Sequence, residues 1–422
     1  MTPTSSLDQL KSSAEAGDAR AQYMLAAQLS GAGAKDEAER WLNASAAQGF
    51  GDALYTLATR ELHDSGLEEA AKKLRRAADN GSALAQRLLG VLYAMGLGVE
   101  RDWREAVRLV SEAAKAGMAP AMRELAMLLF AADPNDEDGA SLIALSAPRD
   151  PVAGAVAVRR FGETRRHADA DAAKAHLDLL ERAQYPHATS LRTAFASADG
   201  SQNFQPLSPH WERIAEKLGE EPAPPSPEAE VLCDAPPARV FRGAFTPEEC
   251  EYVIASAARL LAPSMIADPR TGASIQDPYR TSLTAILALV DLDLALVMVN
   301  RRLAALAGRP PETAECLGVL FYAPGKEYRP HCDWLPPGPE LDRGGQRAAT
   351  GLLYLNQDYE GGETRFILPD LAFKGRMGDV LVFENLKKNG DPDPDSRHAG
   401  LAVRSGGKWI GSTWFREKNY RH

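Results

Sequence analysis

Four segments near the N-terminus share one short pattern of small and apolar residues. They read AEAGDARAQYMLA, AAQGFGDALYTLA, ADNGSALAQRLLG and AKAGMAPAMRELA, and they align without gaps. The aligned columns hold glycine at Gly17, Gly49, Gly81 and Gly117, alanine at Ala21, Ala53, Ala85 and Ala121, and leucine at Leu25, Leu57, Leu89 and Leu125. Repeats spaced by 32 to 36 residues indicate stacked helical hairpins, because one hairpin is too small to bury a core alone.

The charge of the chain is concentrated in its first part. The 422 residues contain 48 Lys and Arg against 58 Asp and Glu, a net charge of −10. Residues 236–422 hold 23 of each kind, so residues 1–235 carry the whole acidic excess. This balance excludes a generally basic nucleic-acid binder. It also predicts that the helical repeats prefer basic partners.

Cysteine usage and the first residues predict a cytoplasmic protein. The four cysteines, at positions 233, 250, 316 and 332, form no C-x-x-C pair, which argues against a disulfide framework. The N-terminal residues MTPTSSLDQLK lack the basic and apolar regions of a signal peptide. Asp291 and Asp293 interrupt the most apolar stretch, LTAILALVDLDLALVMV, so we expect no membrane span.

A Pro-, Glu- and Ala-rich segment, GEEPAPPSPEAEVLCDAPP, predicts a linker over residues 219–237. It divides the chain into an all-α solenoid of helical-hairpin repeats at 1–218, clearest at 10–130, and a second domain at 238–422. In that domain the capping-box pattern of TPEE predicts a helix over 246–261, and a second helix is expected near 291–307. Short β-rich runs follow, namely CLGVLFY, ATGLLYL, TRFIL, DVLVF and WIGSTWF. They predict an antiparallel jelly roll or barrel with flanking helices, and hence a multidomain α and α+β fold.

Three polar residues of the second domain have the composition of a metal site. His331 and Asp333 are two residues apart, so on an extended strand both side chains point to one face. His398 follows 67 residues later, where a later strand of a barrel can return beside the first two. Two histidines and one carboxylate on one face are the ligand set of non-haem Fe(II) oxygenases. An H-x-D pair alone is common by chance and is more often structural.

Two known families resemble parts of the chain. Residues 92–117, LYAMGLGVERDWREAVRLVSEAAKAG, resemble the Sel-one-like repeat, a relative of the tetratricopeptide repeat. From about Val240 to Arg416 the sequence resembles the prolyl 4-hydroxylase-like branch of the Fe(II)/2-oxoglutarate-dependent dioxygenases, which have a double-stranded β-helix fold. The motifs are FTPEEC, DPRTG, RTS, FYAPGKEYRPHCDW, YLNQDYEGGETRF, KGRMGDVLVFEN and HAGLAVRSGGKWIGSTWFR. The resemblance implies that His331, Asp333 and His398 are the catalytic iron ligands.

The same resemblance implies a site for the co-substrate 2-oxoglutarate. Its C5 carboxylate would be buried and therefore needs a cation. Lys408, ten residues after His398, matches the carboxylate-binding lysine of the family, and Tyr322 matches the tyrosine that hydrogen-bonds the same carboxylate. Thr364 and Trp414 match further pocket positions, with core or turn roles as equal alternatives.

Other positions concern the substrate and the shape of the pocket. Tyr328 and Arg280 are candidates to face the substrate, although an ion pair inside the fold is the slightly favoured reading of Arg280. The chain departs from the family at Arg397 and Ala402, where Leu and Pro are frequent. Neither position is a ligand, so the departure bears on the local shape of the pocket.

The resemblance implies an enzyme that uses Fe(II), 2-oxoglutarate and O₂ to hydroxylate a C–H bond. A prolyl residue of a protein or peptide is the expected substrate, and the repeats are expected to recruit a protein partner. L-ascorbate, which similar enzymes use to rescue oxidised iron, is an expected auxiliary. One alternative is a hydroxylase of a free amino acid or another small molecule, and another is a non-catalytic repeat scaffold. The presence of all three candidate ligands and Lys408 argues against the scaffold.

Overall fold

The computed structural model describes residues 6–60, 62, 66–163, 170–196, 204–223, 227–267, 274–276 and 279–420. The DPRTG motif and the terminal residue His422 lie outside these ranges. The chain forms two compact units. The first comprises Met1–Ala132 and Pro209–Glu221, and the second comprises Asp133–Ser208 and Pro222–His422.

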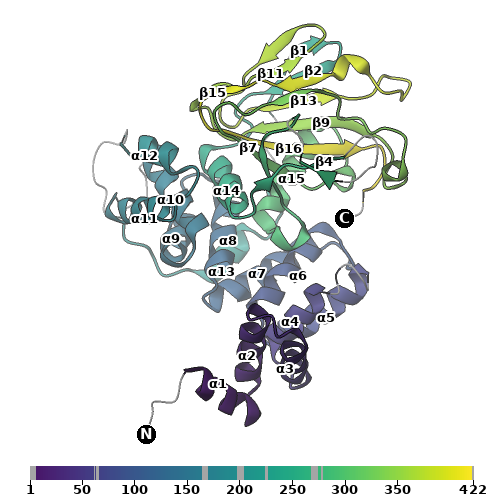
Figure 1. Cartoon of the computed structure of the whole chain (residues 1–422). Helices are drawn as coiled ribbons and strands as arrows, with labels where there is room; N and C mark the ends of the chain where they lie inside the picture. Colours follow the sequence, from purple (N-terminus) through teal and green to yellow (C-terminus); the bar gives the residue numbers. More distant parts are fainter. Residues whose placement is uncertain are drawn as a thin grey trace. The chain divides into compact units, whose positions relative to one another are not determined.

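Consecutive helical hairpins build the first unit (Figure 1). Their helices are α1 (Ser6–Glu15), α2 (Ala19–Gly31), α3 (Lys35–Ala47), α4 (Gly51–Arg60), α5 (Leu67–Asp79), α6 (Ala83–Met95), α7 (Trp103–Lys115) and α8 (Ala119–Ala132). Each glycine of the repeat lies in the turn inside one hairpin, and its φ angle lies between 80° and 95°. Glycine reaches this left-handed region without a steric cost. The predicted repeats are thus confirmed as helical hairpins.

Small residues let neighbouring helices of the first unit approach closely. Ala53, Ala85 and Ala121 are fully buried. A Cβ atom on Gly90 of α6 would lie 3.1 Å from the carbonyl oxygen of Ala106 in α7. Helix α13 (Trp211–Lys217) also belongs to this unit. The indole of Trp103 donates a 2.9 Å hydrogen bond to the carbonyl oxygen of Leu218, just after α13.

Antiparallel strands form the body of the second unit. An eight-stranded sheet has the order β1-β2-β13-β9-β16-β7-β6-β3, and a four-stranded sheet has the order β12-β11-β14-β8. The strands of the larger sheet are β1 (Ala229–Asp234), β2 (Pro237–Phe241), β3 (Ala262–Pro263), β6 (Leu283–Ile286), β7 (Gly318–Tyr322), β9 (Arg347–Tyr354), β13 (Val380–Glu384) and β16 (Lys408–Arg416). Those of the smaller sheet are β8 (Tyr328–His331), β11 (Thr364–Phe366), β12 (Leu371–Phe373) and β14 (His398–Gly400).

The two sheets enclose a common apolar core, which confirms the predicted jelly roll. Phe366 of the smaller sheet meets Phe383 of the larger sheet edge to face, with ring centroids 5.2 Å apart. Leu320, Leu352 and Ile410 belong to the same buried cluster. Two-stranded pairs complete the β structure: β4 (Ile266–Ala267) with β5 (Ser274–Ile275), and β10 (Tyr359–Gly361) with β15 (Val403–Gly406).

Two helices of this unit form where the sequence predicts them. Helix α14 (Pro247–Ala258) begins with the predicted capping box, in which Thr246 and Glu249 exchange side-chain-to-backbone hydrogen bonds. Helix α15 (Leu294–Ala307) is capped by Asp293, one of the two aspartates that interrupt the apolar stretch. Within the described ranges, none of the helices combines the length and apolarity needed to cross a membrane.

Four helices predicted to belong with the repeats belong instead to the second unit. They are α9 (Glu137–Ser146), α10 (Pro151–Glu163), α11 (Ala170–Arg182) and α12 (Ala188–Ala196). Helix α10 packs against α14, and the guanidinium of Arg159 lies 3.0 Å from the buried carboxylate of Glu251. The helical pattern alone could not show which partner covers these helices.

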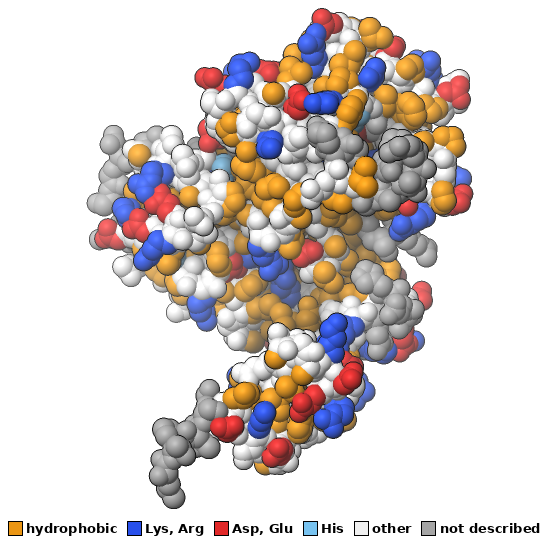
Figure 2. Space-filling view, viewed as in Figure 1, with side chains coloured by type: hydrophobic (Ala, Val, Ile, Leu, Met, Phe, Trp, Pro, Cys, Tyr) orange, Lys and Arg blue, Asp and Glu red, His pale blue; other side chains and the backbone are white. Residues whose placement is uncertain are grey.

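The segment predicted as a linker is also partly structured. Residues 229–234 form β1, which pairs with β2 at the edge of the larger sheet, and Val231 opposes Arg239. The Pro-rich composition of the segment concealed this strand. On the face that Figure 2 shows, basic and acidic side chains lie interspersed over the N-terminal helices of the repeats.

Candidate active site

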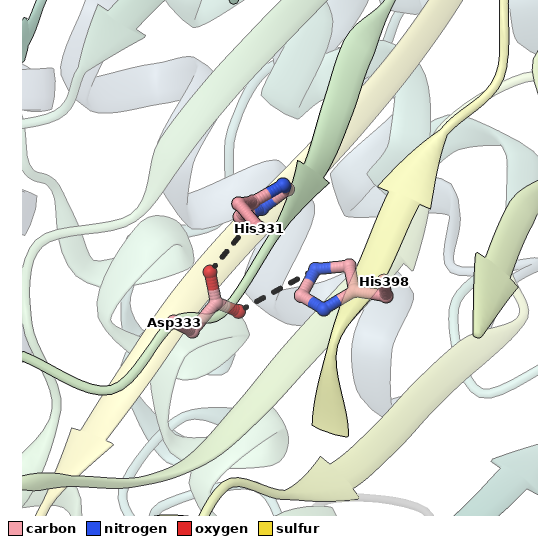
Figure 3. A group of neighbouring side chains, drawn as sticks. All are labelled: His331, Asp333 and His398. Atoms are coloured by element: carbon pink, nitrogen blue, oxygen red, sulfur yellow. Dashed lines mark ion pairs between the residues drawn. The ribbon is translucent and has the colours of Figure 1, made fainter. Parts of the chain in front are cut away.

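Pairing of two strands in the smaller sheet brings the two candidate histidines together. His331 ends β8 and His398 begins β14, and the two residues are direct cross-strand partners. Asp333 lies two residues beyond the end of β8 rather than on the strand. The Asp333 carboxylate is 3.5 Å from Nε2 of His331 and 3.7 Å from Nε2 of His398 (Figure 3). One ligand atom from each residue lies within 4.8 Å of the others.

Backbone carbonyls fix the orientation of both imidazole rings. Nδ1 of His331 is 2.9 Å from the carbonyl oxygen of Arg329, and Nδ1 of His398 is 2.9 Å from that of Ser396. A carbonyl oxygen can only accept, so each Nδ1 carries the hydrogen and donates it. In the neutral form of each ring, Nε2 then carries the lone pair, and this nitrogen is the one near Asp333. Metal-binding histidines are commonly oriented by such a hydrogen bond from their second nitrogen.

The protonation states also suit metal binding. Burial and the nearby charge of His331 lower the pKa of His398 to about 4, so this ring is neutral at physiological pH. Burial alone would raise the pKa of Asp333, but His398, His331 and a hydrogen bond from Thr350 hold it far below its usual value. A neutral imidazole and an ionised carboxylate are the forms that bind a metal.

Lys408 is buried next to this cluster. It is the cross-strand partner of Tyr322, and only 3% of its surface is exposed. Its ammonium donates a 2.7 Å hydrogen bond to the carbonyl oxygen of Gly362, and burial lowers its pKa to about 8. In the described ranges no carboxylate pairs with it. A buried cation in this state is poised to bind a carboxylate.

Thr364 and Trp414 line the same pocket as the candidate ligands and Lys408. The Thr364 hydroxyl is 2.9 Å from the hydroxyl of Tyr354. The guanidinium of Arg347 lies 3.8 Å from the centre of the Trp414 ring, and the buried indole N–H of Trp414 has no hydrogen-bond partner. The structure thus brings together all residues proposed for the co-substrate.

Tyr328 and Arg280 form one wall of this pocket. The Tyr328 ring stacks on His331, with centroids 3.5 Å apart, and the Arg280 guanidinium is 5.0 Å from the Tyr328 ring centre. Arg280 also hydrogen-bonds the hydroxyl of Thr284 at 3.4 Å, while its Nε–H is buried without a partner. Among the described residues no carboxylate pairs with Arg280, so the ion pair favoured for it from the sequence is not seen there.

The pocket at the metal cluster is narrow, about 50 Å³, and Arg280 also lines a larger groove beside it. That groove has a volume of about 560 Å³, and its wall includes Ser264, Leu283, Phe321 and Lys326. Arg280 borders both spaces, and the groove is much larger than the pocket at the metal cluster.

Several residues at the site were not identified from the sequence. Thr350 and Tyr354 reach it from β9, and Asn385 reaches it from the end of β13. The alternation within ATGLLYL, which places Thr350, Leu352 and Tyr354 on one face, was the available signal. No comparable signal marks Asn385 or the carbonyl of Gly362.

Comparison with known proteins agrees with this geometry. Residues 317–416 match the 2OG-Fe(II) oxygenase superfamily. Prolyl 4-hydroxylase 1 of Arabidopsis thaliana is 36% identical over 203 residues, which cover 45% of this chain and 72% of the relative. Probable prolyl 4-hydroxylase 10 of the same plant is 32% identical over 241 residues, which cover 53% of this chain and 83% of the relative.

Solved structures resemble each part of the chain. A viral collagen prolyl hydroxylase from Paramecium Bursaria Chlorella virus-1 is 24% identical with a TM-score of 0.33, covering 44% of this chain and 98% of its own. A Sel1 repeat protein from Oxalobacter formigenes is 34% identical with a TM-score of 0.24, covering 27% of this chain and 92% of its own.

Proposed function

Because this chain belongs to the prolyl 4-hydroxylase family of 2OG-Fe(II) oxygenases, we propose that it hydroxylates prolyl residues within a protein or peptide. It is a 2-oxoglutarate-dependent dioxygenase. The observation that carries the proposal is the cluster of His331, Asp333 and His398 beside the buried cation Lys408. The groove next to the cluster supports a chain substrate over a free amino acid.

The donor set fits a non-haem Fe(II) ion. Two imidazole nitrogens and one carboxylate lie close enough to hold one ion, and this combination is typical of Fe(II) oxygenases. His331, Asp333 and His398 would hold the ion. When bound, iron together with 2-oxoglutarate and O₂ supplies the oxidation of a C–H bond to an alcohol, while 2-oxoglutarate is converted to succinate and CO₂.

The protein holds 2-oxoglutarate through Lys408. A buried ammonium without a carboxylate partner is unfavourable, and the C5 carboxylate of 2-oxoglutarate supplies that partner. The ammonium has three N–H donors, so it can keep its hydrogen bond to Gly362 and donate another to the ligand. Tyr322, Thr364 and Trp414 shape the remaining wall. The buried surroundings exclude water from the reacting centre.

Tyr328 and Arg280 orient the substrate. Tyr328 covers the His331 ring, and Arg280 lies between the Tyr328 ring and the open groove. An aromatic ring packs well against a prolyl ring, and a guanidinium donates hydrogen bonds to peptide carbonyls. These contacts would place one residue of an extended chain near the metal cluster.

Turnover assays test the proposal directly. The purified protein is incubated with Fe(II), 2-oxoglutarate and either proline-rich peptides or free amino acids, and succinate and a product 16 Da heavier are measured. We expect coupled turnover on a peptide, its loss in His331→Ala, and its retention in the control His210→Ala, which lies in the first unit. Turnover on free amino acids alone would contradict the peptide assignment. Omission of L-ascorbate is expected to shorten the time over which the enzyme stays active.

The repeats are proposed to recruit a basic protein partner. Support comes from the first unit, whose residues 1–132 and 209–221 contain 21 Asp and Glu against 17 Lys and Arg, and from the hairpin architecture, which presents an extended surface. Binding of a lysine-rich and a glutamate-rich peptide to the whole chain can be compared by fluorescence anisotropy across a salt series. We expect binding of the lysine-rich peptide that weakens as salt rises. Equal binding of the two peptides would refute the charge preference.

A further inference from the structure

A chain of buried hydrogen bonds runs behind the Asp333 carboxylate. The Thr350 hydroxyl is 2.6 Å from Oδ2 of Asp333, and the Asn385 side-chain nitrogen is 2.9 Å from the same hydroxyl. Thr350 and Asn385 are fully buried, and 6% of Asp333 is exposed. Neither Thr350 nor Asn385 faces the histidines as a ligand. The two residues act on the site only through the carboxylate.

The direction of every hydrogen bond in this chain is fixed by chemistry. An ionised carboxylate can only accept, so the single hydroxyl hydrogen of Thr350 points to Asp333. The hydroxyl oxygen must then accept its second hydrogen bond, which only the amide nitrogen of Asn385 can donate. This requirement also settles which end of the Asn385 amide faces Thr350, an assignment that depends on the hydrogen-bond network.

This orientation leaves a group unsatisfied. Oδ1 of Asn385 is buried without a hydrogen-bond partner. An unsatisfied buried carbonyl is unfavourable for folding, and a leucine, which has the same branching, would avoid it. The carbonyl of Asn385 is thus unfavourable for folding, whereas its amide nitrogen orients the Thr350 hydroxyl. This combination is expected for a residue with a role at the site.

Backbone pairing holds Thr350 and Asn385 in place, whereas the carboxylate that they contact lies beyond the end of a strand. Thr350 lies within β9, between β13 and β16, where its cross-strand partners are Phe383 and Trp414. The backbone N–H of Asn385 donates a 2.8 Å hydrogen bond to Ala348, and its carbonyl accepts one from Asp393. Asp333, in contrast, follows the end of β8. The central strand thus supplies a fixed donor to a carboxylate on a loop.

We propose that Thr350, oriented by Asn385, is a positioning residue that sets the Asp333 carboxylate for metal binding. The inference rests on the proposed role of Asp333 as an iron ligand. Outer partners of metal ligands typically change metal affinity by about 10- to 100-fold when they are removed. The pair should therefore affect the affinity and the geometry of the metal site, beyond any effect on folding.

Titration with Co²⁺ tests the inference, because this ion reports its coordination through visible absorption bands. Affinity is measured for wild type, Thr350→Val and Thr350→Ser, and the thermal midpoint is measured without metal. We expect Thr350→Val to bind Co²⁺ about 10- to 100-fold more weakly with a changed spectrum. Thr350→Ser, which keeps the hydroxyl, should restore the wild-type affinity. Unchanged Co²⁺ affinity in folded Thr350→Val would overturn the proposal.

Asn385→Leu gives a second readout, which also decides the question if Thr350→Val fails to fold. It removes the unsatisfied carbonyl and the donor to Thr350 together. We expect a metal-free midpoint equal to or above that of wild type and weaker Co²⁺ binding. A lowered midpoint with unchanged Co²⁺ affinity would assign the pair a structural role only. Wild-type binding by Asp333→Ala would instead show that the ligand assignment itself fails.

Discussion

Arg159 and Glu251 are 92 residues apart in the sequence and form a buried ion pair with a nitrogen–oxygen distance of 3.0 Å. Nδ1 of His187 lies 2.9 Å from the same carboxylate, and the Tyr185 hydroxyl donates to it at 2.8 Å. Burial alone would raise the pKa of Glu251, but His187 and Arg159 lower it to about 2. This carboxylate joins α10–α12 to α14 and hence to the oxygenase fold.

We expect Arg159→Ala to destabilise the second unit. The variant leaves the buried Glu251 carboxylate with His187 and Tyr185 as its partners, and loss of one partner of a buried ion pair typically costs about 3–5 kcal/mol of unfolding free energy. Urea denaturation followed by circular dichroism measures the change. The control is Arg192→Ala, which breaks the exposed pair with Glu181 and should leave the midpoint near that of wild type. Similar midpoints for both variants would contradict the structural role of the buried pair.

The affinity for 2-oxoglutarate should fall in alkaline solution. Only the protonated ammonium of Lys408 pairs with the C5 carboxylate, and its pKa of about 8 means that it loses its proton as the pH rises through 8. Because one proton is linked to binding, the affinity for 2-oxoglutarate should fall by up to about tenfold per pH unit above this pKa. Calorimetric titration between pH 7 and pH 9.5 measures it. Pyruvate, a 2-oxo acid without the C5 carboxylate, is the control ligand and should show a weaker dependence on pH.

Metal binding should stabilise the second unit through its three ligands. A ligand that binds only the folded state adds about 2.7 kcal/mol when its concentration is 100 times its dissociation constant. We therefore expect Co²⁺ to raise the thermal midpoint of wild type and a chelator to reverse the shift. His398→Ala should fold without metal and show no such shift. A midpoint that rises equally in this variant would point to metal binding elsewhere.

Glycine substitutions should separate two requirements within the repeats. A Cβ on Gly98 would lie 2.2 Å from the carbonyl oxygen of Leu67, and its φ angle is 66°. A Cβ on Gly17, with a φ angle of 95°, would meet nothing within 4 Å. Gly17→Ala should cost about 1–2 kcal/mol for the left-handed backbone alone, and Gly98→Ala should cost more. The difference between the denaturation midpoints of the two variants measures the destabilisation that the steric clash at position 98 causes.

Sequence patterns predicted those features that depend on local spacing. The glycine columns predicted the hairpin turns, the capping box predicted α14, and the H-x-D motif with His398 indicated a metal site. The resemblance to the dioxygenase family added Lys408 to that site. Features that depend on partners distant in the sequence were missed. The hydrogen bond from Asn385, just after β13, to Thr350 in β9 joins residues 35 positions apart, and the pairing of Arg159 with Glu251 joins two helices. Neither has a signal in the spacing of the chain.

The division of the chain into units limits how it could have been assembled from older parts. Residues 1–132 and 209–221 belong to one unit, whereas 133–208 and 222–422 belong to the other. A single recombination event at the proline-rich segment would keep α9–α12 with the repeats. The oxygenase would then lose Arg159 and His187, the partners of Glu251. A single event after Ala132 would instead separate α13 from α7. No single exchange point preserves both units, so an exchange that keeps both of them intact needs more than one breakpoint.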